Sequence, residues 1–569
     1  MESILIMVVS FVGYIIAYNT YGKYLGRKVF KLAEQRVTPA HEFNDGVDYV
    51  PTRKQIIFGH HFTSIAGTGP IVGPAIAIIW GWVPAMVWIF LGSIFMGAVH
   101  DFGSLVMSLR NSGHSMADIT GRLMNRRLRM VFFFVIFLAL LIVIAVFGLV
   151  IAILFKMYPQ SVFPVWSQIL IAVLLGWAVF KKNRKLVPST AVAVIAMYVT
   201  IFLGALFQFE MPTILGVPPT GVWTIILLIY AYIASTLPVG VLLQPRDYIN
   251  AWQLFIAMGL LVLGVFLSHP EVVAPAYNPS PAGAPSMVPF LFITIACGAI
   301  SGFHSLVSAG TSSKQLNSES DARLVGYGSM LTEAALATLV VIAVAAGIGI
   351  HYVTPNNEVL TGIAAWNHHY ATWQAAGGLG SKVAAFVVGA ANMLESVGLP
   401  ASIGVVVMGV FVASFAGTTL DTATRIQRYV ISELATDLKA PRLANRYVAT
   451  GLAVVTAAAL AFSNGAGGKG ALILWPLFGT INQLLAGLSL LVITFYLRKK
   501  GSNYFLTLIP ALFVLLFTTW GMVDSLGTFV SESNWVCLSI QSIALLLNVW
   551  MVAETLTLFA RRGFVVDPK

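Results

Sequence analysis

The chain is poor in charged residues and in cysteine. Asp, Glu, Lys and Arg make up only 10% of its 569 residues, whereas 58% are hydrophobic and the mean hydropathy is +0.85. A soluble globular protein of this length needs more charge on its surface, so that class is excluded. The two cysteines, Cys297 and Cys537, lie in apolar runs, which excludes a disulfide framework and a zinc-binding cysteine set. The composition predicts a polytopic membrane protein that lies in the lipid bilayer.

Motifs of nucleotide hydrolysis and of zinc proteases are missing as well. The chain has no GxxxxGK(S/T) loop, which argues against an ATP-driven pump, and no HExxH helix. An intramembrane metalloenzyme that uses His60, His61 and His304 is the alternative from another class, but adjacent histidines project about 100° apart on a helix. No stretch between the apolar runs is long enough for the output domain of a nutrient sensor. We therefore expect no enzyme activity, no catalytic residue, no metal and no cofactor.

The excess of positive charge follows the membrane topology. A net charge of +11 would suit a nucleic-acid partner, but the basic residues fall mostly in short loops between apolar runs, as the positive-inside rule requires. The loops 269–286 and 352–380 contain no Lys or Arg. We therefore predict no nucleic-acid partner and a multi-pass protein of the cell (inner) membrane. Its N-terminus is expected outside and its C-terminus in the cytoplasm, and its oligomeric state stays open.

About fifteen apolar runs are long enough to be membrane spans, so the predicted fold class is an all-α polytopic membrane protein. Segment 381–397 is also apolar, but as a span it would move every later basic loop outside, so we interpret it as a re-entrant or interfacial outer helix. Segment 111–127 is predicted as a short inner helix. The predicted spans are 3–20, 56–80, 83–110, 129–156, 163–181, 186–208, 220–239, 248–268, 287–313, 324–351, 401–432, 444–463, 471–497, 503–526 and 536–560.

Two glycine-rich stretches indicate an internal repeat. GHHFTSIAGTG at 59–69 and GFHSLVSAGTS at 302–312 share five of eleven residues at a constant offset of 243. The charge topology places them in spans of opposite direction, which predicts an inverted repeat with two broken helices, typical of secondary transporters. Residues 67–70 would break the first helix near the bilayer midplane. The second break is expected at Gly310, with 298–302 as a competing position.

The repeat divides the chain into five parts. They are a first span with a cytoplasmic basic loop (1–55), a first inverted repeat (56–208), two inserted spans with an outer loop (209–286), a second inverted repeat (287–497) and two C-terminal spans (498–569).

A broken helix can hold a solute, because half-helix N-termini attract anions and freed carbonyls can bind cations. His61 and His304 share one repeat position and titrate near neutral pH, so we prefer them to His60 as contacts for substrate or protons. Polar packing between helices is the alternative for each histidine. The predicted substrate-binding residues are His61, Gly67, Thr68, Gly69, His304, Ser308, Gly310 and Thr311.

Two carboxylates deep in the apolar runs are candidates for proton coupling. Asp101 and Glu333 would each need a partner or a proton inside a membrane. A static salt bridge is the alternative for both. Arg246 and Asp247 are predicted at a cytoplasmic turn, where they would act as a gate or a structural lock.

The stretch GTTLDTATR, at 417–425, is a candidate site for a cation. Thr418, Thr419 and Asp421 would offer oxygen ligands to Na⁺, a hard cation. Threonine hydroxyls can instead bond to their own helix, and Asp421 could pair with Arg425 four residues on. The predicted coupling ion is therefore H⁺ or Na⁺.

Six stretches together resemble the carbon starvation protein A family of bacterial and archaeal membrane transporters. They are DYVPTRKQIIFGHHFTSIAGTGPIVGP, STLPVGVLLQPRDYIN, SLVSAGTSSKQL, GYGSMLTEA, TTLDTATRIQRY and WPLFGTINQLLAG, and they cover residues 48 to about 487. The resemblance implies the five-plus-five inverted-repeat fold of the amino acid–polyamine–organocation superfamily, here with extra flanking spans. It also implies ion-coupled import of short peptides or pyruvate by alternating access during carbon starvation. An amino-acid transporter of the same fold is the alternative.

Overall fold

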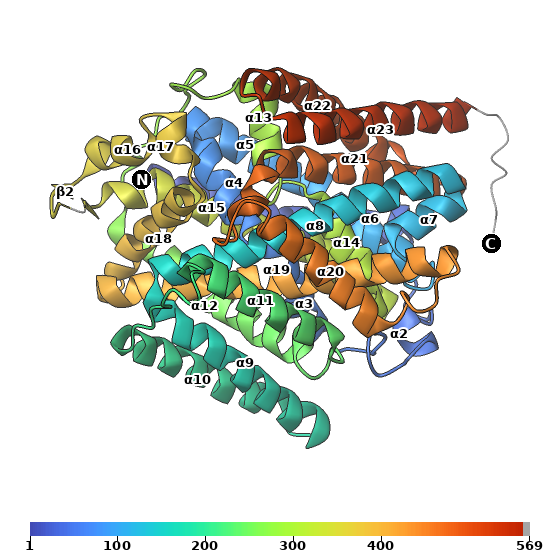
Figure 1. Cartoon of the computed structure of the whole chain (residues 1–569), viewed down its shortest axis with the longest axis horizontal. Helices are drawn as coiled ribbons and strands as arrows, with labels where there is room; N and C mark the ends of the chain where they lie inside the picture. Colours follow the sequence, from blue (N-terminus) through green and yellow to red (C-terminus); the bar gives the residue numbers. More distant parts are fainter. Residues whose placement is uncertain (355, 561–569) are drawn as a thin grey trace.

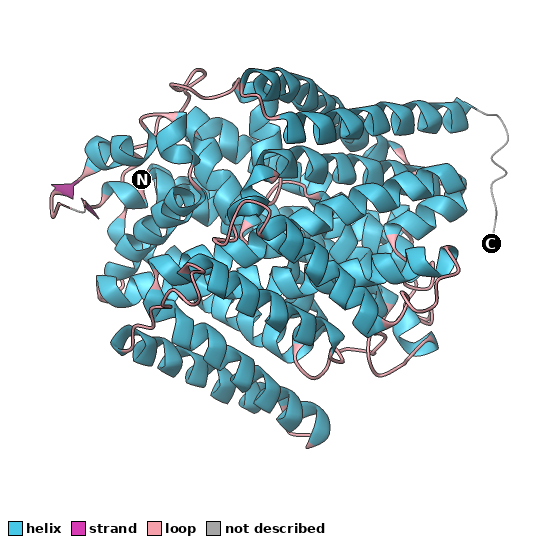
Figure 2. Cartoon of the chain, viewed as in Figure 1, coloured by secondary structure: helices cyan, strands magenta, loops and turns pink. Residues whose placement is uncertain are grey.

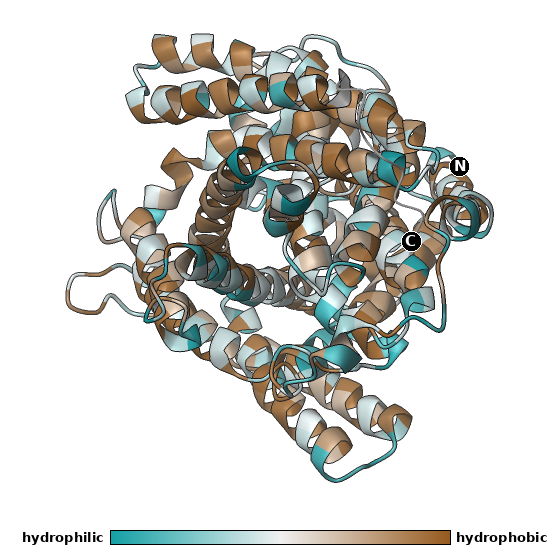
Figure 3. Ribbon diagram, turned by 90° about the vertical axis from the view of Figure 1, so that its right-hand side faces the viewer, coloured by the Kyte–Doolittle hydropathy of each residue, from teal (hydrophilic) through white to brown (hydrophobic). Residues whose placement is uncertain are grey.

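The computed structural model describes residues 1–354 and 356–560, and this part of the chain is almost wholly helical (Figure 1 and Figure 2). Twelve of its helices are long and apolar enough to cross a membrane, and one bent pair raises that number to thirteen. In the described ranges, strands occur only at Tyr352–Val353 (β1) and Val359–Leu360 (β2), which pair antiparallel. The predicted all-α membrane fold is confirmed. Figure 3 shows hydrophobic residues along the outer helices, as a surface that faces lipid requires.

The first eight helices in chain order are α1 (Glu2–Ala17), α2 (Pro39–Glu42), α3 (Lys54–Ala66), α4 (Gly69–Ala77), α5 (Trp82–Gly92), α6 (Ala98–Leu109), α7 (Met116–Leu123) and α8 (Arg126–Met157). The next seven are α9 (Val162–Gly176), α10 (Leu186–Leu206), α11 (Pro219–Thr236), α12 (Leu243–Ser268), α13 (Met287–Thr294), α14 (Gly302–Gly310) and α15 (Ser329–Ala345). The last eight are α16 (Gly362–Tyr370), α17 (Trp373–Gly377), α18 (Leu379–Glu395), α19 (Ala401–Asp437), α20 (Arg446–Ala461), α21 (Trp475–Lys499), α22 (Phe505–Ser531) and α23 (Trp535–Ala560).

The first predicted break is present between α3 and α4, which bend by 40° at Gly67 and Thr68. Glycine is needed at position 67 because a Cβ there would lie 2.5 Å from the Thr419 hydroxyl on α19. Pro70 falls in the first turn of α4, where its missing N–H costs no helical hydrogen bond. The sequence thus both interrupts the helix and restarts it.

The second break lies at the competing position rather than at Gly310. Residues 295–301 between α13 and α14 are not helical, and Gly298 has a φ of +92°, a conformation that favours glycine. Gly310 instead ends α14 and packs against Ile426. The expectation of a break at Gly310 was therefore wrong, because a glycine at a helix end and a glycine at a helix break look alike in sequence.

Because the second break precedes α14, the internal sequence match does not align the two breaks. The match pairs α3, which precedes its break, with α14, which follows its own break. The two half-helices are neighbours in space instead, since Thr52 before α3 forms a parallel bridge with Leu316 after α14.

Helix packing nevertheless relates two sets of helices in the way an inverted repeat requires. The long helices α8 and α19 pack against each other; α11 packs on both, and so does α20. Likewise α12 packs along α3, and α21 packs along α14. The helices of the first set are thus α3–α4, α5–α6, α8, α11 and α12, and those of the second are α13–α14, α15, α19, α20 and α21.

The hairpin of α9 and α10 lies at the edge of the bundle in Figure 1, where α10 exposes large apolar side chains. The predicted boundaries at 56–208 and 209–286 stay predictions. The packing favours α9 and α10, and not α11 and α12, as the inserted pair. Hydropathy alone does not separate these choices, because all four helices are apolar.

Two predicted spans are shorter than a bilayer crossing. The run 287–313 is the broken pair α13–α14, and the run 444–463 holds the sixteen-residue helix α20. The predicted re-entrant segments 381–397 and 111–127 contain α18 and α7, neither of which is among the candidate spans. Asn392 on α18 is buried and donates hydrogen bonds to two backbone carbonyls.

Close packing at the second break gives a first prediction. A Cβ on Gly302 would lie 2.2 Å from the backbone oxygen of Asn482 on α21, so Gly302→Ala should lower stability by about 1–3 kcal/mol. Gly527→Ala on α22 is the control, because no heavy atom lies within 4 Å of a Cβ built there. Thermal unfolding of the detergent-solubilised protein measures both variants. Equal melting temperatures would contradict the tight contact between α14 and α21.

Candidate functional site

Three ionisable side chains from three helices meet beside the second break. His304 on α14 lies between Asp101 on α6 and Glu333 on α15; we call these residues the acid–histidine cluster. The His304 Nδ1 atom is 2.9 Å from Asp101 Oδ2, and its Nε2 atom is 3.4 Å from Glu333 Oε2. His100 Nδ1 lies 2.8 Å from the other oxygen of Asp101. All four side chains are fully buried.

Helical periodicity explains how the polar side chains reach this place. Asp101, Ser104 and Ser108 recur three and four residues apart on α6, so they share one face. That face packs against α14, where Ser108 donates a hydrogen bond to the Ala309 carbonyl. His304 and Ser308 are four residues apart on α14, so they also share one helix face.

The charge of the acid–histidine cluster does not balance if both acids are ionised and only His304 is protonated. A second positive charge would have to come from His100, which contacts Asp101 and is equally buried. Neither oxygen of Glu333 has a hydrogen-bond partner among the residues described. Glu333 has the His304 ring 3.4 Å away but no hydrogen bond to it, so a proton held on one of these two groups would lower the cost of burying them. The predicted roles of Asp101 and Glu333 in coupling stay predictions, but both now have a shared partner.

Cys297, in the second break, joins His304 and Glu333 to form the one set of potential metal-ligating atoms found in the described part of the chain. Their ligand atoms lie within 4.8 Å of one another. The first break reaches the same place, since a Cβ on Gly69 would lie 2.3 Å from the Cys297 sulfur. Because this geometry could accept an ion, the expected absence of a metal stays a prediction.

A second buried network surrounds Arg246 and is called the arginine cluster. It comprises Arg246 and Asp247 on α12, Asp421 on α19 and Tyr230 on α11. Arg246 donates two hydrogen bonds to Asp247 Oδ1, at 3.1 and 2.7 Å, and one from Nη1 to the Tyr230 hydroxyl at 2.7 Å. The same Nη1 contacts Asp421 Oδ2, which also accepts the Tyr230 hydroxyl at 2.9 Å.

One expectation about the position of these residues was wrong, and so was one alternative that had been left open. Arg246 and Asp247 do not lie at a turn, because α12 begins at Leu243 and buries both. Asp421 does not pair with Arg425 four residues on, since its partner is Arg246. Arg425 binds Asp48 instead. Contacts between distant helices therefore replace the local pairing that helical spacing allows.

His60 has the more extensive contacts of the two adjacent histidines. Its Nδ1 atom lies 2.6 Å from Asp247 Oδ2, and its Nε2 atom lies 3.0 Å from the Thr311 hydroxyl after α14. His61 Nδ1 contacts the Ser312 hydroxyl at 2.8 Å, while its Nε2 has no partner in the described ranges. The preference for His61 stays a prediction, and His60 is a link between the arginine cluster and α14 that the repeat could not reveal.

Of the threonines predicted to bind a cation, Thr419 donates a hydrogen bond to another helix and Thr418 donates one to its own. The Thr419 hydroxyl donates to the Ser64 carbonyl at 3.2 Å, across the gap from α19 to the end of α3. Thr418 donates to the Ser414 carbonyl of its own helix, which is the alternative that was left open. Thr68 is buried at the first break. A Na⁺ site beside Thr419 stays a prediction.

One end of the bundle is closed by an ion pair that the sequence did not indicate. The Asp48 carboxylate, before α3, accepts hydrogen bonds from Arg425 at 2.7 Å and from Arg428 at 2.7 and 2.8 Å, both on α19; these three residues are the ionic lock. Burial opposes ionisation of Asp48, but Arg428, Arg425 and Lys314 lower its pKa to about 2. Burial also lowers the pKa of Lys314 to about 8. Arg425 and Arg428 are three residues apart and so share one face of α19, and this spacing is the feature of the sequence that could have indicated a common partner.

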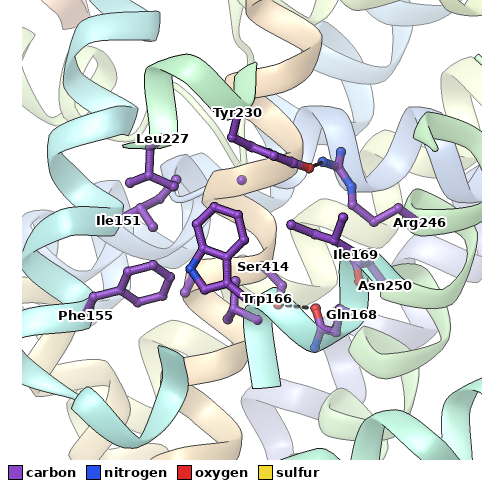
Figure 4. A pocket seen from close by; sticks show the side chains of 13 residues that line it. Ile151, Phe155, Trp166, Gln168, Ile169, Leu227, Tyr230, Arg246, Asn250 and Ser414 are labelled. Carbon is purple, nitrogen blue, oxygen red and sulfur yellow. Dashed lines mark hydrogen bonds between the residues drawn. The ribbon is translucent and has the colours of Figure 1, made fainter. Parts of the chain in front are cut away.

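A pocket lies between α8, α9, α11, α12 and α19 (Figure 4). Its cavity is small, with a volume of about 30 Å³, so a solute could enter only if the surrounding helices moved apart. Trp166 and Phe155 form an aromatic wall, and Arg246 and Tyr230 form a polar end. Its lining includes none of the predicted substrate-binding residues, which lie on α3, α4 and α14 or next to the ends of these helices.

Two broken helices that meet at buried ionisable groups, inside a bundle of at least twelve candidate spans, define a membrane transporter of the inverted-repeat class. The fold agrees with that of a mutant manganese transporter from Eremococcus coleocola, with a TM-score of 0.52 over 90% of this chain and 99% of that one. The two sequences are 10% identical, so this likeness shows the fold alone.

The chain belongs to the family described as Carbon starvation protein CstA, whose sequence profile matches residues 2–521. It is 32% identical to the peptide transporter CstA of Campylobacter jejuni, over 95% of this chain and 83% of that protein. It is also 32% identical to the pyruvate/proton symporter BtsT of Escherichia coli K12, over 91% and 81% of the two chains. The predicted family and the transport of a small molecule across a membrane are thereby confirmed.

The ionic lock gives a second prediction. Asp48→Asn leaves two buried guanidinium groups without a carboxylate and should destabilise the protein by about 3 kcal/mol. Because the pKa of Asp48 is lowered from 3.8 to about 2, its contribution is complete above pH 4 and is lost as pH falls towards 2. The drop in melting temperature should therefore be equal at pH 6 and pH 8. Glu42→Gln, an exposed acid, is the control, and an equal drop in this control would contradict the lock.

Proposed function

We propose that the chain is a proton-coupled secondary transporter that imports a small carboxylate-bearing nutrient, either a short peptide or pyruvate. The acid–histidine cluster carries this proposal, because it places two buried acids on either side of one histidine next to a broken helix. The names of two relatives, a peptide transporter and a pyruvate/proton symporter, support the substrate class and the coupling ion.

Proton binding would be coupled to helix movement because the three residues of the cluster belong to three different helices. His304 moves with α14, whereas Asp101 and Glu333 belong to α6 and α15. A shift of α14 would separate the histidine from one acid, and a carboxylate that loses its cationic neighbour binds a proton more tightly. The other titratable groups facing this site are His100 on α6, His61 on α3 and Cys297 in the break. Proton binding and helix position are thus coupled in both directions.

Alternating access also needs a closed and an open state at each end. With the N-terminus outside and the C-terminus in the cytoplasm, as the basic loops predict, the ionic lock closes the cytoplasmic end. Gln244 adds to this closure, since its amide binds Thr52 and Gln315 on the two segments that meet there. Release of substrate to the cytoplasm would require Asp48 to leave Arg425 and Arg428.

Sodium is the second candidate for the coupling ion. The observation in its favour is the Thr419 hydroxyl, which lies against the Ser64 carbonyl at the end of α3. A cation at this place would join α19 to the first broken helix. Proton and sodium coupling differ in the gradient that drives uptake, so one experiment separates them.

The third prediction concerns Glu333. In proteoliposomes, an inward proton gradient should drive accumulation of radiolabelled pyruvate or dialanine, and Glu333→Gln should reduce accumulation at least tenfold. Exchange of substrate without a gradient should fall much less, because it needs no net proton transfer. Glu395→Gln is the matched control, as Glu395 is about half exposed and outside the cluster. Metal analysis of the same protein tests whether the cluster holds an ion.

Three results would contradict the proposal. One is uptake that follows a Na⁺ gradient and ignores a proton gradient, which would favour the Thr419 site. Another is a Glu333→Gln protein that accumulates substrate as well as the Glu395→Gln protein. The last is the absence of gradient-driven uptake of either substrate.

A further inference from the structure

The pocket of Figure 4 has a single charged group in its lining, the Arg246 guanidinium at its polar end. The other walls are mostly apolar or aromatic and include Phe155, Trp166 and Leu227. Beside α19 the space is open, because a Cβ built on Gly417 would have no heavy atom within 4 Å. A guanidinium at one end and apolar walls elsewhere suit a small anion with an apolar body, if that anion replaces a carboxylate already bound to Arg246.

Arg246 is held by two carboxylates, but not equally. Asp247 is fixed on both sides: its Oδ1 accepts two hydrogen bonds from Arg246, and its Oδ2 lies 2.6 Å from His60. Asp421 uses only Oδ2, for Arg246 and Tyr230. Its Oδ1 is buried and has no hydrogen-bond partner within the residues described. Asp421 is therefore the carboxylate that can be replaced at the lower cost.

We propose that the substrate carboxylate binds Arg246 in this pocket by replacing Asp421, which takes up a proton as it leaves the guanidinium. The inference rests on the proposed function and names the receptor for the substrate anion. Charge is conserved in this exchange. The Asp421 carboxylate takes a proton from water and leaves the Arg246 guanidinium, and the substrate carboxylate binds the guanidinium in its place. The charge of the buried site is unchanged, so one proton is bound with each carboxylate.

Other charged groups around Asp421 leave this exchange intact. Arg246 and Asp247 face it from α12, Tyr230 faces it from α11, and His60 on α3 reaches it only through Asp247. Arg425 on the same helix is already bound to Asp48 and to two backbone carbonyls. Among these groups, Arg246 is the cation that directly contacts Asp421.

Two further polar atoms narrow the class of substrate. The Trp166 indole Nε1 and the Asn250 side-chain Oδ1 both belong to residues that line the pocket, and both are buried without a partner in the described ranges. A peptide group supplies an acceptor for the first and a donor for the second, whereas a keto acid supplies only the acceptor. A dipeptide that enters as the pocket widens would satisfy both atoms, whereas a keto acid would satisfy only the indole N–H.

Equilibrium binding to the purified full-length protein tests this inference without any ion gradient. Radiolabelled dialanine and pyruvate are the probes, titrated between pH 5.5 and 8. Gly417→Leu fills the pocket and should weaken binding of both probes at least tenfold. The helix itself should tolerate this change, because leucine has a higher helix propensity than glycine. Gly259→Leu is the matched control, because this exposed glycine on α12 also has no heavy atom within 4 Å of a built Cβ.

Two polar substitutions test the exchange itself. Asp421→Asn mimics the protonated acid, so affinity should lose its dependence on pH. Arg246→Lys keeps the charge but not the forked geometry and should weaken binding at least tenfold. Equal affinity of the Gly417→Leu and Gly259→Leu proteins, or an Asp421→Asn protein with the pH dependence of the unmodified chain, would overturn the inference.

Failure of this inference and failure of the proposed function can be told apart. If Glu333→Gln loses accumulation as expected while Gly417→Leu binds normally, proton-coupled transport stands and the carboxylate binds elsewhere. If no gradient drives uptake but the pocket variants lose binding, the pocket stands and the coupling mechanism is wrong.

Discussion

The structure depends on one constraint: a carboxylate buried inside a membrane protein needs a cation or a proton. Asp101 and Glu333 share His304, and His100 also contacts Asp101. Asp247 and Asp421 share Arg246, and His60 also contacts Asp247. In each site one acid, Glu333 or Asp421, has a single basic partner, so a proton could take the place of that cation. A protein that only needed stability could replace such groups by apolar residues at little cost. The proposed cycle, in which one of these acids binds and releases a proton, gives a reason for their presence.

The broken helices convert this constraint into movement. Gly67 follows the last residue of α3, and Gly298 lies in the non-helical stretch between α13 and α14, so breaks separate the short helices α3 and α14 from α4 and α13. His60 ties α3 to the arginine cluster and to Thr311, and His304 ties α14 to its two acids. A change in protonation at either site therefore acts on the same pair of half-helices.

Much of the fold followed from the sequence, because span length, the placement of basic residues and glycine-rich breaks are local signals. Asp101 and Glu333 were also recognised individually, since charge is rare in apolar runs, whereas Arg246 was expected at a turn and Asp421 at a cation site. Their partners were not, because His304 lies between helices far apart in the chain, and helical spacing wrongly favoured Arg425 for Asp421. The second break was misplaced since the sequence match aligns neighbouring half-helices rather than the two breaks.

The central claim is that protons and carboxylates cross the membrane together. The most direct measurement is the internal pH of proteoliposomes when dialanine or pyruvate is added outside, in sodium-free buffer with the membrane potential clamped. The account predicts that the interior becomes acidic at a rate that follows substrate uptake. Uptake without acidification, or uptake that begins only when Na⁺ is added, would contradict it.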